Sequence, residues 1–313
     1  METADATAPA STADWCLPAD TDAFLTRAGS FLHARAALHT MLLTITRTLS
    51  TRGPHAYGDG APEFGVLERG GTVGAAFLRT PPHRLHVTPL TAPEADALAA
   101  RLADLGRALP GVHAEQDTAA AFADAWCRRT GARATLRERQ RLYRLGELTV
   151  PAPAPPGRAR VAGPADRRQL AAWYGDFCAA VGHAPPQDPD GWADARAEAG
   201  EVVLWELPDG TPVAMACRSP IVAGQSRVVG VYTPVELRGR GYAGAATAEV
   251  SRAVAAEGAE EVLLFTDLAN PTSNDLYQRL GYRPIADFTV YDFEAPARDA
   301  TTPARDAAAP AGA

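Results

Sequence analysis

The heptapeptide RGRGYAG stands at residues 238–244, between an apolar stretch that predicts a strand (residues 227–233) and an Ala-rich stretch that predicts a helix (residues 242–256). At such a strand-to-helix turn several backbone N–H groups face outward, and with the helix dipole they favour an anion such as pyrophosphate. Glycine lets the phosphate approach the backbone, because a side chain would block it. The sequence therefore predicts a phosphate-binding loop that consists of Arg238, Gly239, Arg240, Gly241, Tyr242, Ala243 and Gly244.

Other interpretations of this loop are weaker. Its glycines fit the dinucleotide pattern GxGxxG, with Asp267 twenty-three residues after the last one. That pattern belongs on the first strand of its domain, with further βα units to follow, whereas 46 residues follow Asp267 here. A P-loop is excluded because no Gly-Lys-Ser/Thr closes the loop. A Gly-rich turn without a ligand stays as an alternative.

A second motif, NPTSNDLYQRLGY, follows at residues 270–282. Together the two motifs resemble the GNAT superfamily of N-acetyltransferases. Arg238, Gly241 and Ala243 fit its acyl-CoA signature R-x-x-G-x-A. The second motif looks like the element that follows in the family, with an Asn seven residues before a Tyr and a closing Gly-aromatic pair. The resemblance covers about residues 158–293.

The resemblance implies a site for acetyl-CoA. In that superfamily the cofactor lies where two neighbouring parallel strands splay apart, which here implies a cleft between residues 227–233 and 262–266. The pantetheine arm would bind the backbone of one strand edge, and the pyrophosphate would bind the loop at residues 238–244. The residues implied to contact the cofactor outside that loop are Val231, Tyr232, Thr233, Asn270 and Ser273.

The resemblance also implies that Tyr277 is the general acid. When an amine attacks the thioester, the departing CoA thiolate must be protonated, and a neutral phenol can donate that proton. The alternative for Tyr277 is a core residue whose hydroxyl is hydrogen-bonded. Asn274 departs from the family pattern, which usually has an aliphatic residue there. No general base stands out: Asp267 and Glu206 both have counterparts in the first half of the chain, and a water chain to solvent would serve equally well.

Residues 151–157 (PAPAPPG) predict a stiff, extended linker, since consecutive prolines cannot continue a helix. They divide the chain into a first part, residues 15–150, and a second part, residues 158–294. The low-complexity residues 1–14 and 295–313 predict disordered tails.

The two parts repeat one pattern, with an offset that grows from 138 to 150 residues. The matches are Glu63–Glu68 with Glu201–Glu206, Arg79–Pro81 with Arg218–Pro220, Val87–Pro89 with Tyr232–Pro234, and Asp117 and Gly131 with Asp267 and Gly281. Offsets that grow only at turns and loops indicate a duplicated fold. The expected fold is therefore α/β (α+β), with tandem GNAT-like units. Each unit would have a mixed, mostly antiparallel central sheet, flanked by helices and containing a splayed parallel strand pair.

The first part is expected to be a degenerate copy that does not bind acetyl-CoA. The stretch equivalent to the phosphate loop, residues 90–96 (LTAPEAD), has no glycine and carries two carboxylates. Ala120 stands in the place of Asn270, and Cys127 in the place of Tyr277. This part would instead cover the sheet of the second part or supply a wall of the acceptor pocket.

Composition excludes several classes of function. The formal net charge of −7, with neither part basic, argues against a nucleic-acid partner. No apolar run approaches the about 20 residues that a membrane span needs, and the acidic N-terminus does not resemble a signal peptide. The four cysteines and seven histidines show no ligand spacing, so we expect no metal and no disulfide and interpret the histidines as ordinary. A cytoplasmic location fits best.

These observations predict an N-acetyltransferase that moves an acetyl group from acetyl-CoA to a primary amine by direct attack. A small-molecule acceptor is favoured over a protein tail. Two alternatives stay open: a catalytically silent acyl-CoA-binding or regulatory module, and a dinucleotide-dependent oxidoreductase.

Overall fold

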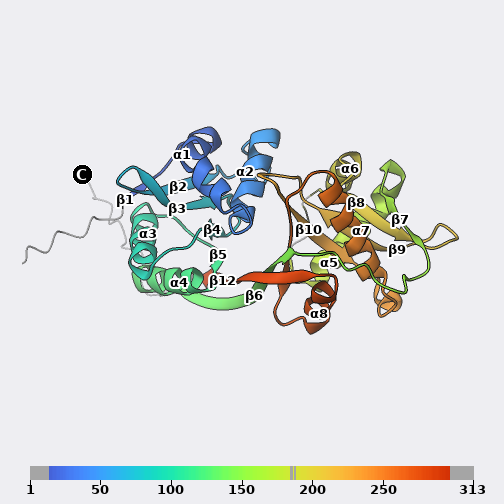
Figure 1. Cartoon of the computed structure of the whole chain (residues 1–313). Helices are drawn as coiled ribbons and strands as arrows, with labels where there is room; N and C mark the ends of the chain where they lie inside the picture. The colour runs from blue at the N-terminus through green and yellow to red at the C-terminus, as the bar shows by residue number, and fades with distance from the viewer. Residues whose placement is uncertain (1–13, 184–185, 187, 297–313) are drawn as a thin grey trace, which may run out of the picture.

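The structure, a computed structural model, describes residues 14–183, 186 and 188–296. Apart from the residues at their inner ends, the predicted tails therefore lie outside the described residues. The described strands join into a single twelve-stranded sheet (Figure 1).

The first part folds into six strands and four helices within the described residues. Its strands are β1 (Asp14–Cys16), β2 (Glu63–Arg69), β3 (Thr72–Arg79), β4 (Leu85–Val87), β5 (Gly111–Glu115) and β6 (Arg133–Leu145). Its helices are α1 (Thr21–Ala34), α2 (Thr40–Arg52), α3 (Ala92–Asp104) and α4 (Gln116–Thr130).

The second part repeats this order, as the sequence matches predicted. Its strands are β7 (Arg158–Val161), β8 (Val202–Glu206), β9 (Pro212–Arg218), β10 (Gln225–Tyr232), β11 (Glu261–Asp267) and β12 (Tyr282–Glu294). Its helices are α5 (Arg167–Ala180), α6 (Pro189–Glu198), α7 (Tyr242–Ala256) and α8 (Pro271–Arg279), with the short 3-10 turns η1 (Pro164–Asp166) and η2 (Val235–Leu237). The predicted tandem α+β fold is confirmed, and α7 has the predicted bounds.

The sheet differs from two units packed side by side. Its strand order is β1-β2-β3-β4-β5-β12-β6-β11-β10-β9-β8-β7, so β12 pairs with β5 and β6 pairs with β11. Each part thus gives its last strand to the other part, and the two exchanged strands pair with each other over most of their length. Figure 1 shows β6 and β12 crossing between the parts along the lower side of the view. The exchange leaves no free edge between the units, which makes one continuous sheet.

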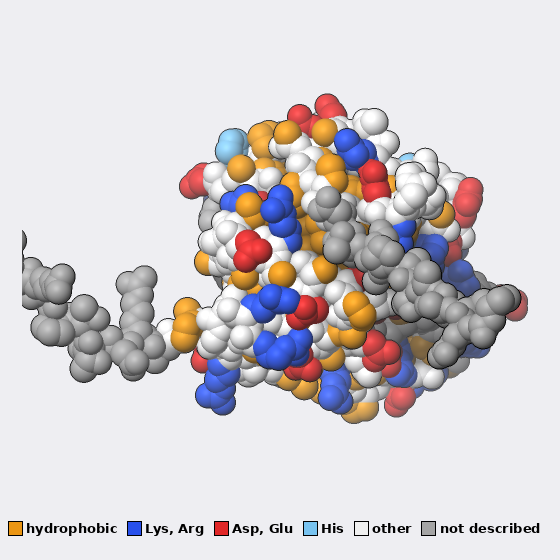
Figure 2. Space-filling model, turned by 90° about the vertical axis from the view of Figure 1, so that its left-hand side faces the viewer, with side chains coloured by type: hydrophobic (Ala, Val, Ile, Leu, Met, Phe, Trp, Pro, Cys, Tyr) orange, Lys and Arg blue, Asp and Glu red, His pale blue; other side chains and the backbone are white. Residues whose placement is uncertain are grey.

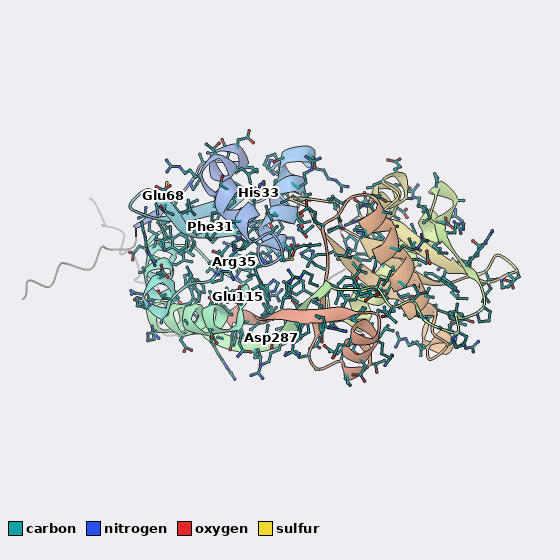
Figure 3. The ribbon with its side chains drawn as sticks, viewed as in Figure 1. Phe31, His33, Arg35, Glu68, Glu115 and Asp287 are labelled. Atoms are coloured by element: carbon teal, nitrogen blue, oxygen red, sulfur yellow. The ribbon has the colours of Figure 1, made fainter. Side chains whose placement is uncertain are left out.

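The register across the exchanged strands corrects one of the sequence matches. Glu115, the last residue of β5, lies opposite Phe288 of β12, and Figure 3 shows Glu115 there. Phe288 also lies opposite Gln140 of β6, and Gln140 lies opposite Asp267, the last residue of β11. The residue equivalent to Asp267 is therefore Glu115. The match of Asp267 with Asp117 was wrong, because Asp117 lies in the first turn of α4.

Helices cover both faces of the second part's sheet. Val203 and Trp205 of β8 pack in a core with α7 and α8, whereas Val202 and Leu204 pack in a core with α5 and α6. Successive strand residues point to opposite faces, so α7 and α8 lie on one face and α5 and α6 on the other. At the end of the molecule formed by the first part, acidic and basic side chains are interspersed (Figure 2).

Candidate active site

The strands β10 and β11 form the splayed pair that the sequence predicted. Their parallel pairing joins Gln225–Arg227 to Glu261–Leu263. Beyond these residues β10 continues to Tyr232 and β11 to Asp267, and no further pairing joins the two strands within the described chain. The carboxyl ends of both strands therefore flank an opening in the sheet.

An irregularity in β10 shapes the segment implied to bind pantetheine. The register of β10 with β9 shifts between Val229 and Tyr232, and Gly230 between them has a φ of +56°. A Cβ on Gly230 would lie 3.3 Å from Tyr174 and 3.4 Å from Cys217, so the close approach favours glycine. The shift leaves the edge of β10 that faces β11 unpaired at its last residues.

Thr233, which follows β10, supplies a polar atom without a partner. Its side chain is buried, and its Oγ1 makes no hydrogen bond with any described residue. An unpartnered buried hydroxyl costs free energy unless a ligand or water satisfies it. Thr233 lies in the segment implied to bind pantetheine, so this orphaned hydroxyl fits an amide-bearing ligand in the opening.

The predicted phosphate loop, residues 238–244, leads into α7 with its backbone amides free. Gly239 and Gly241 have φ of +76° and +84°, a region that favours glycine. The first hydrogen bond within the helix runs from the Ala245 N–H to the Gly241 carbonyl, and no described side chain caps this end. The N–H groups ahead of Ala245 therefore face outward with the positive end of the helix dipole.

The side chains of the loop are engaged with the protein, so the backbone is the part that could bind phosphate. The Arg238 Nε donates to the Thr233 carbonyl at 3.1 Å, and an Arg240 Nη donates to the Glu236 carbonyl at 3.2 Å. Tyr242 is 6% exposed, and its ring lies in the core beneath α7.

The start of α8 is tied to the end of β11. The Asn270 side chain caps the helix by accepting from the Ser273 N–H at 3.1 Å. The Asn274 Nδ2 donates to the carbonyls of Asp267 and Asn270, both at 2.8 Å. The Tyr143 hydroxyl, from the exchanged strand β6, donates to the Asn274 Oδ1 at 2.9 Å. These bonds explain why a polar residue replaces the expected aliphatic one at position 274.

Tyr277 lies in the core on the α7 and α8 face, and its hydroxyl makes no hydrogen bond with any residue that the structure describes. The ring packs edge-on against Tyr282, with ring centroids 6.1 Å apart, and 9% of the residue is exposed. Burial raises the pKa of Tyr277 to about 12, so the phenol keeps its proton at neutral pH. The ring packing suits a core residue, whereas a hydroxyl without a partner among the described residues is what a proton donor requires.

The equivalent helix end in the first part is closed. The Glu94 Oε2 accepts from the Thr91 N–H at 2.8 Å and from the Thr91 hydroxyl at 2.7 Å. Glu94 is 7% exposed and also pairs with Arg69. The chain's own carboxylate thus occupies the start of α3, and Pro93 offers no amide donor. A second anion there would meet a fixed negative charge.

This contrast predicts one acetyl-CoA site per chain. Isothermal titration with acetyl-CoA is expected to give a stoichiometry of one, because residues 238–244 lead into α7 with free backbone amides, whereas Glu94 closes the equivalent start of α3. Two sites per chain, with one surviving a Gly241→Val substitution, would contradict the prediction.

The other candidate residues, Asp267 and Glu206, make contacts within the protein that suit structural roles. The Asp267 Oδ1 accepts from the Ala269 N–H at 2.8 Å, and Glu206 pairs with Arg158 and Arg160. All four cysteines are free. The described residues contain no group of His, Cys, Asp and Glu that could hold a metal ion. Within the described ranges, none of the helices combines the length and apolar character that a membrane crossing requires.

A cavity of about 380 Å³ opens beside the splayed pair, on the face of α5. Its lining residues come from α5, from the end of β10 and from the segment that leads to the phosphate loop: Trp173, Asp176, Ala179, Ala180, Tyr232, Pro234, Val235, Glu236 and Arg238. The Tyr232 hydroxyl donates to the Asp176 Oδ2 at 3.2 Å. This cavity could not be predicted from the sequence, because its lining comes from segments far apart in the chain.

Comparisons with known proteins agree with this architecture. The family of FR47-like proteins matches residues 214–291. A GCN5-related N-acetyltransferase from Sphaerobacter thermophilus has a TM-score of 0.59 and 18% identity, over 90% of this chain and 95% of its own. A GNAT-family acetyltransferase from Colwellia psychrerythraea has a TM-score of 0.54 and 13% identity, over 90% and 99%. A tandem GNAT protein from the clavulanic acid biosynthesis pathway has a TM-score of 0.52 and 14% identity, over 91% and 100%. No curated protein matches the sequence.

The protein is thus an α+β protein with the fold of the GNAT superfamily, and the resemblance inferred from residues 238–244 and 270–282 is confirmed. More narrowly, it has the tandem GNAT arrangement over about nine-tenths of the chain, with an FR47-like segment in its second part.

Proposed function

We propose that the protein is an N-acetyltransferase that transfers the acetyl group of acetyl-CoA to a primary amine on a small molecule. The observation that carries this proposal is the uncapped start of α7 at the open end of the β10 and β11 pair, set against the capped start of α3. The loop amides would hold the pyrophosphate, and the edge of β10 would hold the pantetheine arm. Tyr277 would protonate the departing thiolate after the amine attacks the thioester carbon.

The proposal is tested first by binding and then by turnover. Acetyl-CoA is expected to raise the melting temperature, because a ligand that binds only the folded state stabilises it. NADH and NADPH are expected to leave it unchanged, and the reverse result would favour an oxidoreductase. Release of free CoA thiol is then measured with a library of small amines. Tight acetyl-CoA binding without thiol release from any amine would favour a silent acyl-CoA-binding module.

The cavity beside α5 suits a cationic acceptor. Its lining includes the carboxylates of Asp176 and Glu236 against one cation, Arg238, together with the rings of Trp173 and Tyr232, and aromatic faces attract ammonium groups. We therefore expect kcat/KM for a cationic amine to fall as salt rises from low to physiological strength, because ions screen the field beyond about 8 Å. Steady-state rates at several ionic strengths check this. A rate independent of salt, or a preference for anionic acceptors, would count against a cationic substrate.

A further inference from the structure

The chain turns sharply at the end of α5. The Val181 N–H bonds the Phe177 carbonyl, and the His183 N–H bonds the Cys178 carbonyl at 2.8 Å. Gly182 has a φ of +66°. A left-handed glycine with these bonds is a common way to close a helix, and it redirects the chain at a fixed angle. The turn therefore gives His183 a defined position just past the helix.

The exchanged strand β6 holds this turn. The Glu138 Oε2 lies 3.7 Å from the His183 Nε2, an ion-pair distance. The neighbouring Arg137 donates from its guanidinium to the Gly182 carbonyl. Both contacts come from the first part of the chain and reach a turn of the second part.

The turn lies over the open end of the splayed pair. Asp176 contacts Tyr232 at the end of β10, and seven residues later His183 contacts Glu138 on β6. In the sheet β11 lies between β10 and β6, so α5 and its closing turn span β11. The helix itself ends at Ala180, and the three residues of its closing turn complete the distance from β10 to β6.

Along β6, Glu138 lies just past the end of β11. Asp267, the last residue of β11, pairs with Gln140, and the next N–H, of Leu268, bonds the Arg139 carbonyl. His183 and Glu138 therefore lie at the carboxyl end of β11, on the α5 face. Tyr277 packs on the opposite face, so the two groups flank the opening from its two sides.

The charges around Glu138 favour a carboxylate there. Burial alone would raise the pKa of Glu138, but the neighbouring polar side chains of His183, Gln140 and His113 outweigh it and lower the pKa. The Glu138 side chain is 18% exposed, whereas that of His183 is 47% exposed. The carboxylate is thus screened from solvent, and the imidazole can be reached by a substrate.

We propose that His183 is the general base of this site and that Glu138, from the exchanged strand, is the residue that positions it; the inference rests on the proposed acetyl transfer. The acceptor arrives as an ammonium ion, and His183 takes one proton through Nδ1, because Nε2 faces Glu138. The freed nitrogen lone pair attacks the thioester carbon, and the carbon–sulfur bond breaks. Tyr277 gives its proton to the sulfur and recovers the second proton of the amine nitrogen, while His183 releases the first to solvent.

The test compares His183→Ala with His33→Ala, since Figure 3 shows His33 on α1 in the first part and it is exposed. His183→Ala is expected to lower kcat/KM by at least tenfold, because base catalysis is typically worth about 10²–10⁴-fold and water replaces part of it. The fall in rate at low pH that comes from protonating the base should disappear, and added imidazole should restore part of the rate. Glu138→Gln should lower the rate with a changed pH profile. The affinity for acetyl-CoA should stay unchanged in all three variants.

A wild-type pH profile and rate in His183→Ala, or no rescue by imidazole, would overturn the inference while leaving acetyl transfer intact. Absence of acetyl-CoA binding by the wild-type protein would instead overturn the proposed function. If acetyl-CoA binds and no amine reacts, the inference is tested with the imidazole NMR signals of His183. These signals are assigned by their loss in His183→Ala. They should shift when acetyl-CoA is added, and unchanged signals would overturn the inference.

Discussion

Replacing Tyr277 with Phe is expected to lower kcat for acetyl transfer by about 10²–10⁴-fold, the usual contribution of general acid catalysis. The substitution removes only the hydroxyl, so the packing against Tyr282 persists. Because that hydroxyl has no hydrogen bond among the described residues, its loss leaves no partner unsatisfied and the melting temperature should stay close to wild type. A loss confined to kcat, with KM for acetyl-CoA nearly constant, is the kinetic sign of an interaction made in the transition state.

The control is Tyr291→Phe, which removes a hydroxyl from the segment of β12 that pairs with β5. This variant is expected to keep full activity. A Tyr277→Phe protein that folds, binds acetyl-CoA and retains full kcat would show that Tyr277 is a core residue and that another group donates the proton.

Replacing Gly241 with Val is expected to weaken acetyl-CoA binding at least tenfold. Gly241 has a φ of +84°, and a Cβ there would lie 3.8 Å from Pro155 of the linker. Valine would therefore change the direction of the loop amides and fill space beside them. Each charge-assisted hydrogen bond lost is worth about 1.5–3 kcal/mol, and 1.4 kcal/mol is about tenfold in affinity. Calorimetry with acetyl-CoA measures the change directly.

Gly258→Val is the control for the backbone strain that a branched residue introduces at a positive φ. Gly258 has a φ of +98° with open space around its Cβ position. It follows the other end of α7, about 22 Å from Gly241 along a helix of 15 residues. This variant should lose stability but keep its affinity for acetyl-CoA. Unchanged binding by a folded Gly241→Val protein would exclude residues 238–244 as the phosphate loop.

Local features of the candidate site were predictable from sequence because each depends on a few neighbouring residues. The loop at residues 238–244 is marked by glycines at positive φ, and α7 starts and ends where its Ala-rich pattern does. The cap at Asn270 also follows from residue type. How these elements pack against one another, by contrast, could not be predicted from the spacing of residues in the sequence.

Neither the cavity beside α5 nor the hydrogen-bond partners of Asn274 could be predicted from the sequence. In the sequence, Asn274 departs from the family pattern. In the structure, the hydroxyl of Tyr143 on β6 donates a hydrogen bond to the Asn274 Oδ1, which explains the polar residue. The equivalence of Asp267 with Glu115 was also missed, because loops of different length hide it and only strand register shows it.

The sequence by itself determined the repeated order of strands and helices, the glycine loop at residues 238–244 and the absence of such a loop from the first part. Periodicity, glycine positions and turn residues act over a few residues, so they survive in any arrangement of the units.

Only the tertiary structure decided which strands are neighbours. β6 and β12 could each have paired within its own part, and the choice depends on which sheet edge is open and on contacts far apart in the chain. The exchange of β6 places Glu138 beside His183 and Tyr143 beside Asn274. The first part, which has no such glycine loop, thereby supplies residues to the candidate site of the second, because a hydrogen-bonded strand fixes the positions of its side chains wherever its backbone pairs.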